Sequence, residues 1–245
     1  MNPLDIVRSE AEPLVETVEI KTHFKTPRGI ARAVDGVSIQ IRRGQSLGVV
    51  GESGSGKTVL SRSIMGLLPR NGVIREGSVR YQGQEIGNRS SKEMRAIWGR
   101  EMAMIFQDPM TSLNPVMKVG KQITESLRLH LGMSASEAMT IAEKLFRDVR
   151  IPEPTRRLNQ YPHELSGGMR QRVMIAIAMA CGPNMLFADE PTTALDVTVQ
   201  AQILELISEQ KRDRNMSLLL VTHNLGVVAG RSEEHTSELQ SRIRI

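Results

Sequence analysis

The spacing of apolar and polar residues predicts strands at the start of the chain, followed by strands that alternate with helices. Short β-rich runs separated by turn residues predict strands over 15–20, 31–34 and 37–41. An apolar run over 47–50 precedes helical apolar spacing over 58–68, and helical spacing is also expected over 91–98. Later apolar runs predict further strands at 77–81, 102–106, 185–188 and 217–221.

The middle of the chain changes to helical spacing. Residues 119–149 predict helices, and Ser134 with Glu137 has the spacing of a capping box. Further helices are expected from about residue 167 and over 197–212. Strands that alternate with helices predict a mostly parallel α/β sheet, and the helical middle is then an insertion into that core. One face of the helix behind the capping box carries Ala138, Ile141, Ala142, Leu145, Phe146 and Val149.

The composition is that of an ordinary globular protein. A chain of 245 residues with 40% hydrophobic and 24% charged residues fits one domain with room for a subdomain. No run approaches the roughly 18 apolar residues of a membrane span, and residues 1–14 read as a loose leader without the apolar core of a signal peptide. The single cysteine, Cys181, excludes a disulfide within the chain, and its apolar neighbours predict a packing role.

The charge pattern favours a solvated surface over a nucleic-acid interface. The net charge of +5 comes mostly from scattered arginines, and the aromatic content of 3% is too low for a series of base-stacking platforms. A basic face near anionic lipid is equally compatible with this charge. We therefore expect no nucleic-acid partner.

The stretch between the strand at 47–50 and the following helix carries the most specific chemistry. It fits the phosphate-binding pattern G-x-x-x-x-G-K-[ST], and it has the strand–loop–helix context that this pattern requires. Its glycines let successive N–H groups point inward as an anion nest at the positive end of a helix. Lys57 can then reach the β- and γ-phosphates of a nucleoside triphosphate, and the Thr58 hydroxyl can bind Mg²⁺. The eight residues are Gly51, Glu52, Ser53, Gly54, Ser55, Gly56, Lys57 and Thr58.

A second acidic site is expected beside such a loop, because Mg²⁺ needs a carboxylate and hydrolysis needs a positioned water molecule. The apolar strand that starts at Met185 ends in Asp189 and Glu190. Asp189 can face the metal through its water shell. Glu190 can face the attacking water as general base.

A second glycine-rich stretch, Leu165-Ser166-Gly167-Gly168-Met169, starts a helix. Small residues at a helix N-terminus make another anion-binding nest. The loop over 51–58 already gives one molecule a complete phosphate cradle. The second nest is therefore predicted to serve the nucleotide of another copy.

With these motifs, the chain resembles the ATPase family of ABC transporters over about residues 15–230. The resemblance implies an α/β fold: a P-loop NTPase core with a mostly parallel sheet, an N-terminal antiparallel β subdomain and an inserted α-helical subdomain. It also implies that the chain is an ATPase, with ATP and Mg²⁺ as cofactors. In family terms, 51–58 matches the Walker A loop, 165–169 the signature and 185–190 Walker B.

The resemblance assigns roles to four more positions. Gln107 matches the Q-loop, Asp196 in Ala194-Leu195-Asp196 matches the D-loop, and His223 matches the switch histidine that contacts the γ-phosphate. Phe24 falls where the family places an aromatic that stacks on adenine, although its own neighbours fit a core anchor equally well. The implied catalytic residues are Glu190, His223, Gln107 and Lys57. The implied metal ligands are Thr58, Gln107 and Asp189, and the implied nucleotide contacts are Phe24, residues 51–58, Ser166, Gly167, Gly168 and Asp196.

More narrowly, the string from Phe106 to Pro115 and the Tyr161-Pro162-His163-Glu164 run resemble ATPases of the peptide/nickel importer group. Met169 replaces the glutamine of the general signature, a variant usual in one of two paired subunits of that group. The resemblance implies a heterodimer with a related, non-identical ATPase, two membrane-spanning permease subunits and an extracytoplasmic binding protein. The implied location is peripheral, on the cytoplasmic face of the bacterial inner membrane. Alternatives are an exporter ATPase and an inactive nucleotide-binding fragment.

The resemblance also sets expected boundaries. The ATP-binding core with its antiparallel β subdomain is expected over 15–112 and 183–230, and the helical subdomain over 113–182. Residues 231–245 resemble an in-frame translation of a sequencing adapter. We expect this tail to be non-native and the natural chain to continue beyond about residue 230.

Overall fold

The computed structural model describes residues 12–69, 71–192 and 197–223. These residues fall in two compact units. The first unit holds the described residues up to 94 together with 219–223, and the second holds those between 95 and 218. The expected boundaries of the helical subdomain, near 113 and 182, were placed from motifs and not from compact units. They stay a prediction.

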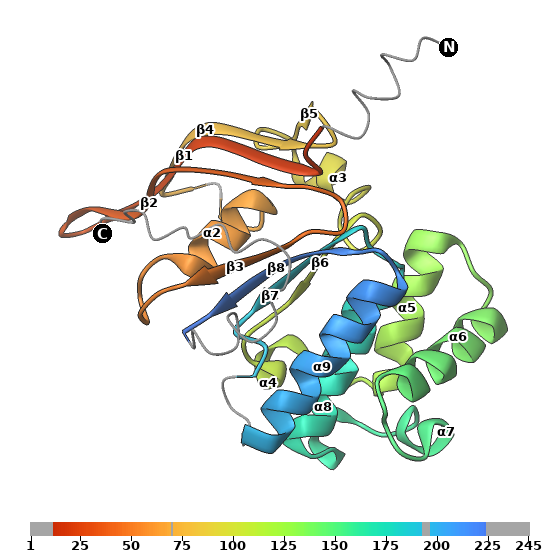
Figure 1. Cartoon of the computed structure of the whole chain (residues 1–245). Coiled ribbons are helices and arrows are strands. Elements are labelled where there is room, and N and C mark those ends of the chain that lie inside the picture. The colour runs from red at the N-terminus through yellow and green to blue at the C-terminus, as the bar shows by residue number, and fades with distance from the viewer. Residues whose placement is uncertain (1–11, 70, 193–196, 224–245) are drawn as a thin grey trace, which may run out of the picture. The chain divides into compact units, whose positions relative to one another are not determined.

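The first unit contains an antiparallel sheet with the strand order β2-β1-β4-β5 (Figure 1). Its strands are β1 (Val15–Thr26), β2 (Gly29–Ile41), β4 (Val73–Tyr81) and β5 (Gln84–Glu85). The antiparallel pairing of β1 with both β2 and β4 confirms the expected β subdomain.

Two predicted strands, 31–34 and 37–41, are parts of the single strand β2. The prediction was wrong because Asp35-Gly36 reads as a turn. In the structure, Ile20 pairs with Val37 and Lys21 with Asp35, which leaves Gly36 as an extra residue in a bulge with φ 75°. Only glycine adopts this left-handed conformation without strain, so the chain bulges here and the strand continues.

The first unit also contains β3 (Ser46–Val50), the neighbour of β8 (Ser217–Thr222), whose residues 219–222 belong to this unit. Helix α2 (Lys57–Ile64) follows β3, and α3 (Ser91–Met94) comes later. Both helices are shorter than predicted. In α2 the reason is Gly66, which has φ 65° and ends the helix with backbone hydrogen bonds to the last turn.

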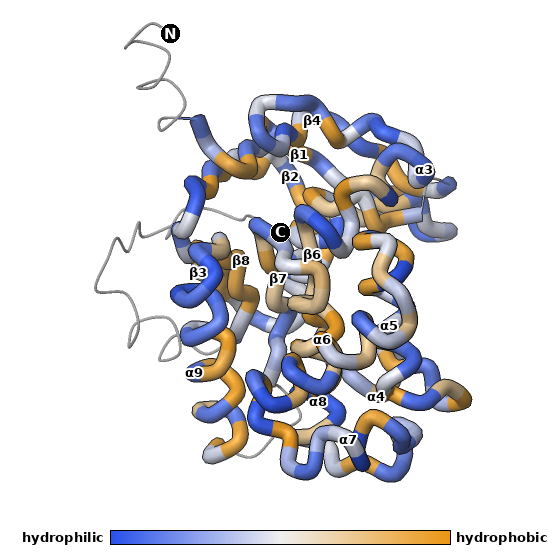
Figure 2. The backbone as a smooth tube through the Cα atoms, turned by 90° about the vertical axis from the view of Figure 1, so that its right-hand side faces the viewer, coloured by the Kyte–Doolittle hydropathy of each residue, from blue (hydrophilic) through white to orange (hydrophobic). Residues whose placement is uncertain are grey.

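In the second unit, β6 (Met102–Ile105) pairs in parallel with β7 (Met185–Asp189). The start of β8 lies beside this pair, since the Ser217 N–H donates to the Asn184 carbonyl at 2.9 Å. Every residue of β6 and β7 is buried, and Figure 2 shows hydrophobic residues along both strands. Parallel strands covered on both faces read as continuous apolar runs, which is why the sequence predicts them well.

Helices make up most of the second unit (Figure 1). The capping box of α6 is confirmed, because Ser134 Oγ accepts from the Glu137 N–H while Glu137 accepts from the Ser134 N–H. All residues of the predicted apolar face are buried except Ile141, which is half-buried. The described helices are α4 (Pro109–Ser112), α5 (Val119–Leu131), α6 (Ala135–Asp148), α7 (Pro154–Arg157), the 3-10 helix η1 (Pro162–Glu164), α8 (Gly167–Met179) and α9 (Val197–Asp213).

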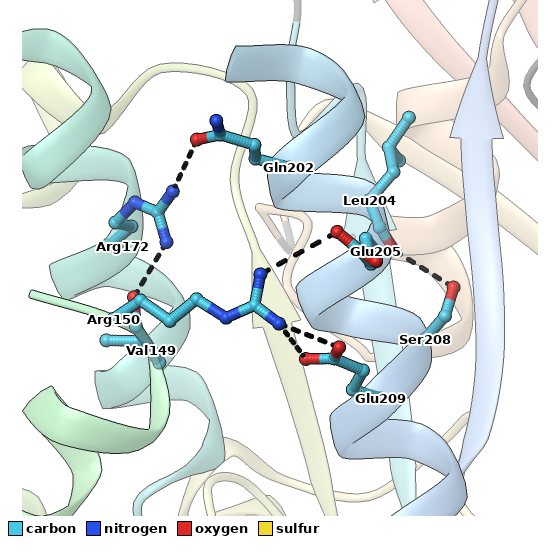
Figure 3. Close-up of polar contacts among 8 residues, drawn as sticks. All are labelled: Val149, Arg150, Arg172, Gln202, Leu204, Glu205, Ser208 and Glu209. Atoms are coloured by element: carbon cyan, nitrogen blue, oxygen red, sulfur yellow. Dashed lines mark hydrogen bonds and ion pairs between the residues drawn. The ribbon is translucent and has the colours of Figure 1, made fainter. Parts of the chain in front are cut away.

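Helix α8 packs against α5, α6 and α9. Arg172 of α8 is one polar link in this packing, since its guanidinium donates to the Val149 carbonyl at 2.8 Å and to Gln202 Oε1 of α9 at 3.0 Å (Figure 3). Partial burial, and then the charge of Arg150, lower the pKa of the Arg172 guanidinium. The link therefore joins the end of α6, α8 and α9.

Arg150, just after α6, makes a second link to α9. Its guanidinium donates to both carboxylate oxygens of Glu209 at 2.8 and 2.9 Å and lies 3.6 Å from Glu205 (Figure 3). The Arg150 side chain is 49% exposed. Because water screens such pairs, each contributes only about 0.2–1 kcal/mol to stability.

The packing of α6 gives a test of its assigned faces. Phe146 is fully buried and Met139 is 44% exposed. We expect Phe146→Ala to lower the free energy of unfolding by about 3–5 kcal/mol, because it leaves a cavity. Met139→Ala, the control, should change it by less than about 0.5 kcal/mol. Urea denaturation followed by circular dichroism measures both, and similar losses in the two variants would contradict the assignment.

Candidate functional site

The loop over 51–58 connects β3 to α2 in the first unit. Gly54 and Gly56 have φ of 83° and 79°, and Gly56 is the N-cap of α2. A Cβ at Gly56 would lie 2.0 Å from the Ala33 carbonyl oxygen of β2. Glycine is therefore required at this position both by its backbone angles and by the close approach of β2.

Lys57 is the first residue of α2 and is 5% exposed. Its ammonium donates to the carbonyls of Gly51 at 2.7 Å and Glu52 at 2.6 Å, and it lies 3.4 Å from Ser55 Oγ. The loop thus curls around a positive charge at the N-terminus of a helix, where backbone N–H groups add further positive potential. This arrangement fits a phosphate group.

Phe24 and His223 lie elsewhere in the first unit. Phe24 is half-buried on β1, paired with Ala31 of β2 and Val73 of β4. His223 is exposed and directly follows β8. Exposure of His223 at a strand end suits a ligand contact, whereas half-burial of Phe24 fits a core anchor and a stacking residue equally.

In the second unit, the carboxyl ends of β6 and β7 bring Gln107 and Glu190 together. Ile105 pairs with Ala188 in the parallel register, so the residues two positions further along each strand lie side by side. Gln107 Nε2 donates to Glu190 Oε2 at 3.2 Å. Asp189, the last residue of β7, is fully buried.

Glu190 has an unusual backbone conformation. Its φ is 45°, in the left-handed region, and a proline follows it. Such a conformation costs a non-glycine residue about 1–3 kcal/mol, so the surrounding structure must hold it. Strained residues of this kind gather at functional sites, and the position of Glu190 agrees with its predicted role.

The second glycine-rich stretch forms the start of α8, as predicted. Ser166 is the N-cap, and its Oγ accepts from the Met169 N–H at 3.3 Å. Ser166 and Gly167 are exposed, and a Cβ at Gly168 would lie 3.3 Å from Val199 Cγ1 of α9. The tip of α8 is therefore open to a ligand and closely packed behind. Asp196 of the predicted D-loop lies outside the described residues.

Sequence reasoning missed Gln171 of α8. Its side chain is 2% exposed, and Nε2 donates to the Pro191 carbonyl oxygen at 2.5 Å. A single polar residue in an apolar helix can indicate a buried hydrogen bond. Here Arg170 and Arg172 flank Gln171, so the sequence reads as an exposed polar stretch.

Cys181 is half-buried, not fully buried. Its Sγ lies 3.6 Å from the Ser126 carbonyl oxygen, and burial raises the pKa of the thiol. A raised pKa lowers the thiolate fraction, so the residue is a poor nucleophile.

The residues present fit a magnesium nucleotide. Among the described residues, no group of three or more His, Cys, Asp or Glu side chains could hold a metal ion. Magnesium typically binds through one or two carboxylates together with phosphate oxygens and water. Asp189 supplies a buried carboxylate in the second unit, and Thr58 a half-buried hydroxyl in the first. Within the described ranges, no helix is long and apolar enough to cross a membrane.

Comparisons with known proteins agree with this picture. The profile of the ABC transporter family matches residues 34–193. The oligopeptide transport ATP-binding protein OppD of Haemophilus influenzae is 50% identical over 218 residues, which covers 89% of this chain and 67% of that protein. The dipeptide transport ATP-binding protein DppD of Escherichia coli is 50% identical over 216 residues, which covers 88% and 66%. The chain spans about two thirds of the length of these relatives.

A solved structure extends the likeness to the fold. A dimeric post-hydrolysis state of the ATP-binding cassette MJ0796, bound to ADP and Pi, has a TM-score of 0.78 and 27% identity, covering 87% of this chain and 89% of that one. This similarity confirms the predicted α/β P-loop NTPase fold. Because the family profile matches residues 34–193 and half of the aligned residues are identical to those of a transport ATP-binding protein, the chain belongs to the ABC transporter family.

Proposed function

We propose that the chain binds and hydrolyses ATP and that it supplies the energy for peptide transport, as an import subunit. The observation that carries this proposal is the Lys57 ammonium held by the carbonyls of a loop that only glycine permits at position 56. Its similarity to oligopeptide and dipeptide transport ATP-binding proteins supports the substrate class.

The first unit would hold the nucleotide. The N–H groups of residues 51–58 and the Lys57 ammonium would contact the β- and γ-phosphates. Phe24 would stack on the adenine, and His223 would contact the γ-phosphate. Thr58 would supply a hydroxyl oxygen to Mg²⁺, and the family resemblance implies Asp189 and Gln107 as further metal ligands. When bound, the metal would supply positive charge that neutralises the phosphates.

Glu190 would act as the general base. Its carboxylate would accept a proton from the water that attacks the γ-phosphorus, while ADP leaves. The amide of Gln107 donates to one oxygen of this carboxylate at 3.2 Å. Gln107 would therefore orient the base as well as contribute to the metal site.

The exposed tip of α8 would serve a facing ATPase subunit. Ser166, Gly167 and Gly168 offer a helix N-terminus to an anionic ligand, and a similar cassette has been solved as a dimer with ADP and Pi. Asp196 would join this contact. Met169 supports a related but non-identical partner. ATP held between the two subunits would favour the closed dimer through its higher affinity for that state.

The assembly proposed around this pair includes two permease subunits and an extracytoplasmic binding protein. The chain would lie on the cytoplasmic face of the bacterial inner membrane, bound through the permease subunits. The names of its relatives support dipeptides and oligopeptides as the class of transported substrate.

The role of Glu190 can be tested by Glu190→Gln in the assembled transporter. We expect ATP hydrolysis to fall by at least about 100-fold, because general-base catalysis typically contributes 10²–10⁴-fold. ATP affinity should stay within about twofold, since Gln107 can still donate to the new amide oxygen. Steady-state hydrolysis and binding of a fluorescent ATP analogue measure the two effects. Unchanged hydrolysis would remove Glu190 from this role.

The role of Lys57 can be tested by Lys57→Met, which keeps an unbranched side chain one atom shorter and removes its charge. We expect the affinity for the fluorescent ATP analogue to fall about tenfold to 100-fold, because charge-assisted hydrogen bonds contribute about 1.5–3 kcal/mol. Lys92→Met, at an exposed lysine of the same unit, is the control and should leave affinity unchanged. Equal affinities in both variants would argue against a phosphate site at this loop.

A further inference from the structure

Gln171 is a buried polar side chain that contacts the segment directly after Glu190. It is 2% exposed, and its Nε2 donates to the Pro191 carbonyl oxygen at 2.5 Å. From α9, Gln200 Nε2 donates to the carbonyl oxygen of the next residue, Thr192, at 3.0 Å. Side chains from two helices therefore hold two successive carbonyls of this segment.

This contact bears directly on Glu190. With φ 45° before a proline, Glu190 keeps its conformation only because its surroundings determine it. A buried amide has no water molecule to turn to, so its hydrogen bond fixes the carbonyl that it contacts. Fixing the Pro191 carbonyl fixes the backbone on one side of Glu190, while Gln107 holds its carboxylate on the other.

The same helix carries the tip described above. Ser166 is the N-cap of α8, and Gln171 lies in its second turn. Six of its 13 residues are buried, and it packs against α5, α6 and α9, so a shift at its start is passed along the helix as a rigid element. One rigid helix thus touches the Glu190 segment of its own chain and, on the proposed function, the nucleotide of the facing subunit.

We propose that Gln171 is a positioning residue, which ties the orientation of the Glu190 carboxylate to the placement of the signature helix α8. Engagement of Ser166–Gly168 by nucleotide then fixes α8, and the Gln171–Pro191 hydrogen bond passes that placement to Glu190. Hydrolysis at each nucleotide depends in this way on how the same chain engages the other one.

Gln171→Met removes the donor and nearly keeps the side-chain volume. In the assembled transporter we expect kcat for ATP hydrolysis to fall about tenfold to 100-fold, the loss that a misplacement of about 1 Å causes. The KM for ATP should stay within about twofold, because no residue of the nucleotide loop changes. Gln171→Asn keeps the amide but withdraws it by one methylene, and it should lower kcat in the same way. It also tests the inference if the methionine variant does not fold.

Gln202→Met is the matched control. It removes the Arg172–Gln202 hydrogen bond, which joins the same two helices away from Pro191 (Figure 3). We expect its kcat to stay within about twofold of the wild type. A loss equal to that of Gln171→Met would mean that loosening the helix packing explains both, and it would overturn the inference.

A double variant separates positioning from general damage to the fold. If Gln171 acts through Glu190, adding Gln171→Met to Glu190→Gln should lower the residual hydrolysis no further and leave binding of the fluorescent ATP analogue unchanged, since residues that act as a unit are non-additive. A further drop of tenfold or more would contradict the inference. A wild-type transporter without ATP hydrolysis would instead contradict the proposed function, whereas an active wild type with unaffected Gln171 variants contradicts only this inference.

Discussion

The nucleotide loop depends on one backbone constraint. At Gly56 the chain turns with φ 79° so close to β2 that any side chain would strike the Ala33 carbonyl. This contact fixes where α2 begins and hence where its first N–H groups point. It also places the Lys57 ammonium among the loop carbonyls, where burial strengthens its field. A helix N-terminus and a held cation together suit the first unit to a phosphate group.

In the second unit the site depends on the parallel pairing of β6 and β7, which are buried along their whole length. That pairing aligns the carboxyl ends of β6 and β7 and sets Gln107 beside Glu190. Hydrogen bonds from α8 and α9 hold the carbonyls of the two residues that follow Glu190. The N-terminus of α8, at Ser166, is exposed to solvent. The proposed function therefore pairs the open tip of α8 with the nucleotide of a facing ATPase subunit.

Much of this structure could be predicted from sequence, for identifiable reasons. Strands β6 and β7 appear as uninterrupted apolar runs because both of their faces are covered. The capping box before α6 is a local pattern whose geometry hardly depends on distant residues. The glycine-lysine loop is recognised from its local spacing, although its backbone also packs against β2. The spacing of apolar and polar residues also predicted which motifs lie at strand ends and which at helix starts.

The remaining features depend on contacts that no local pattern encodes. The bulge at Gly36 looks like a turn, because only the pairing across β1 and β2 shows the strand continuing. The left-handed conformation of Glu190 is imposed by the residues around it, and the burial of Gln171 is hidden between two arginines. The most direct test of the account is photolabelling by 8-azido-ATP in the assembled transporter carrying Ser166→Arg in this chain. The account predicts that labelling of this chain persists while labelling of the facing ATPase subunit is lost; loss from this chain, with the facing subunit unaffected, would contradict it.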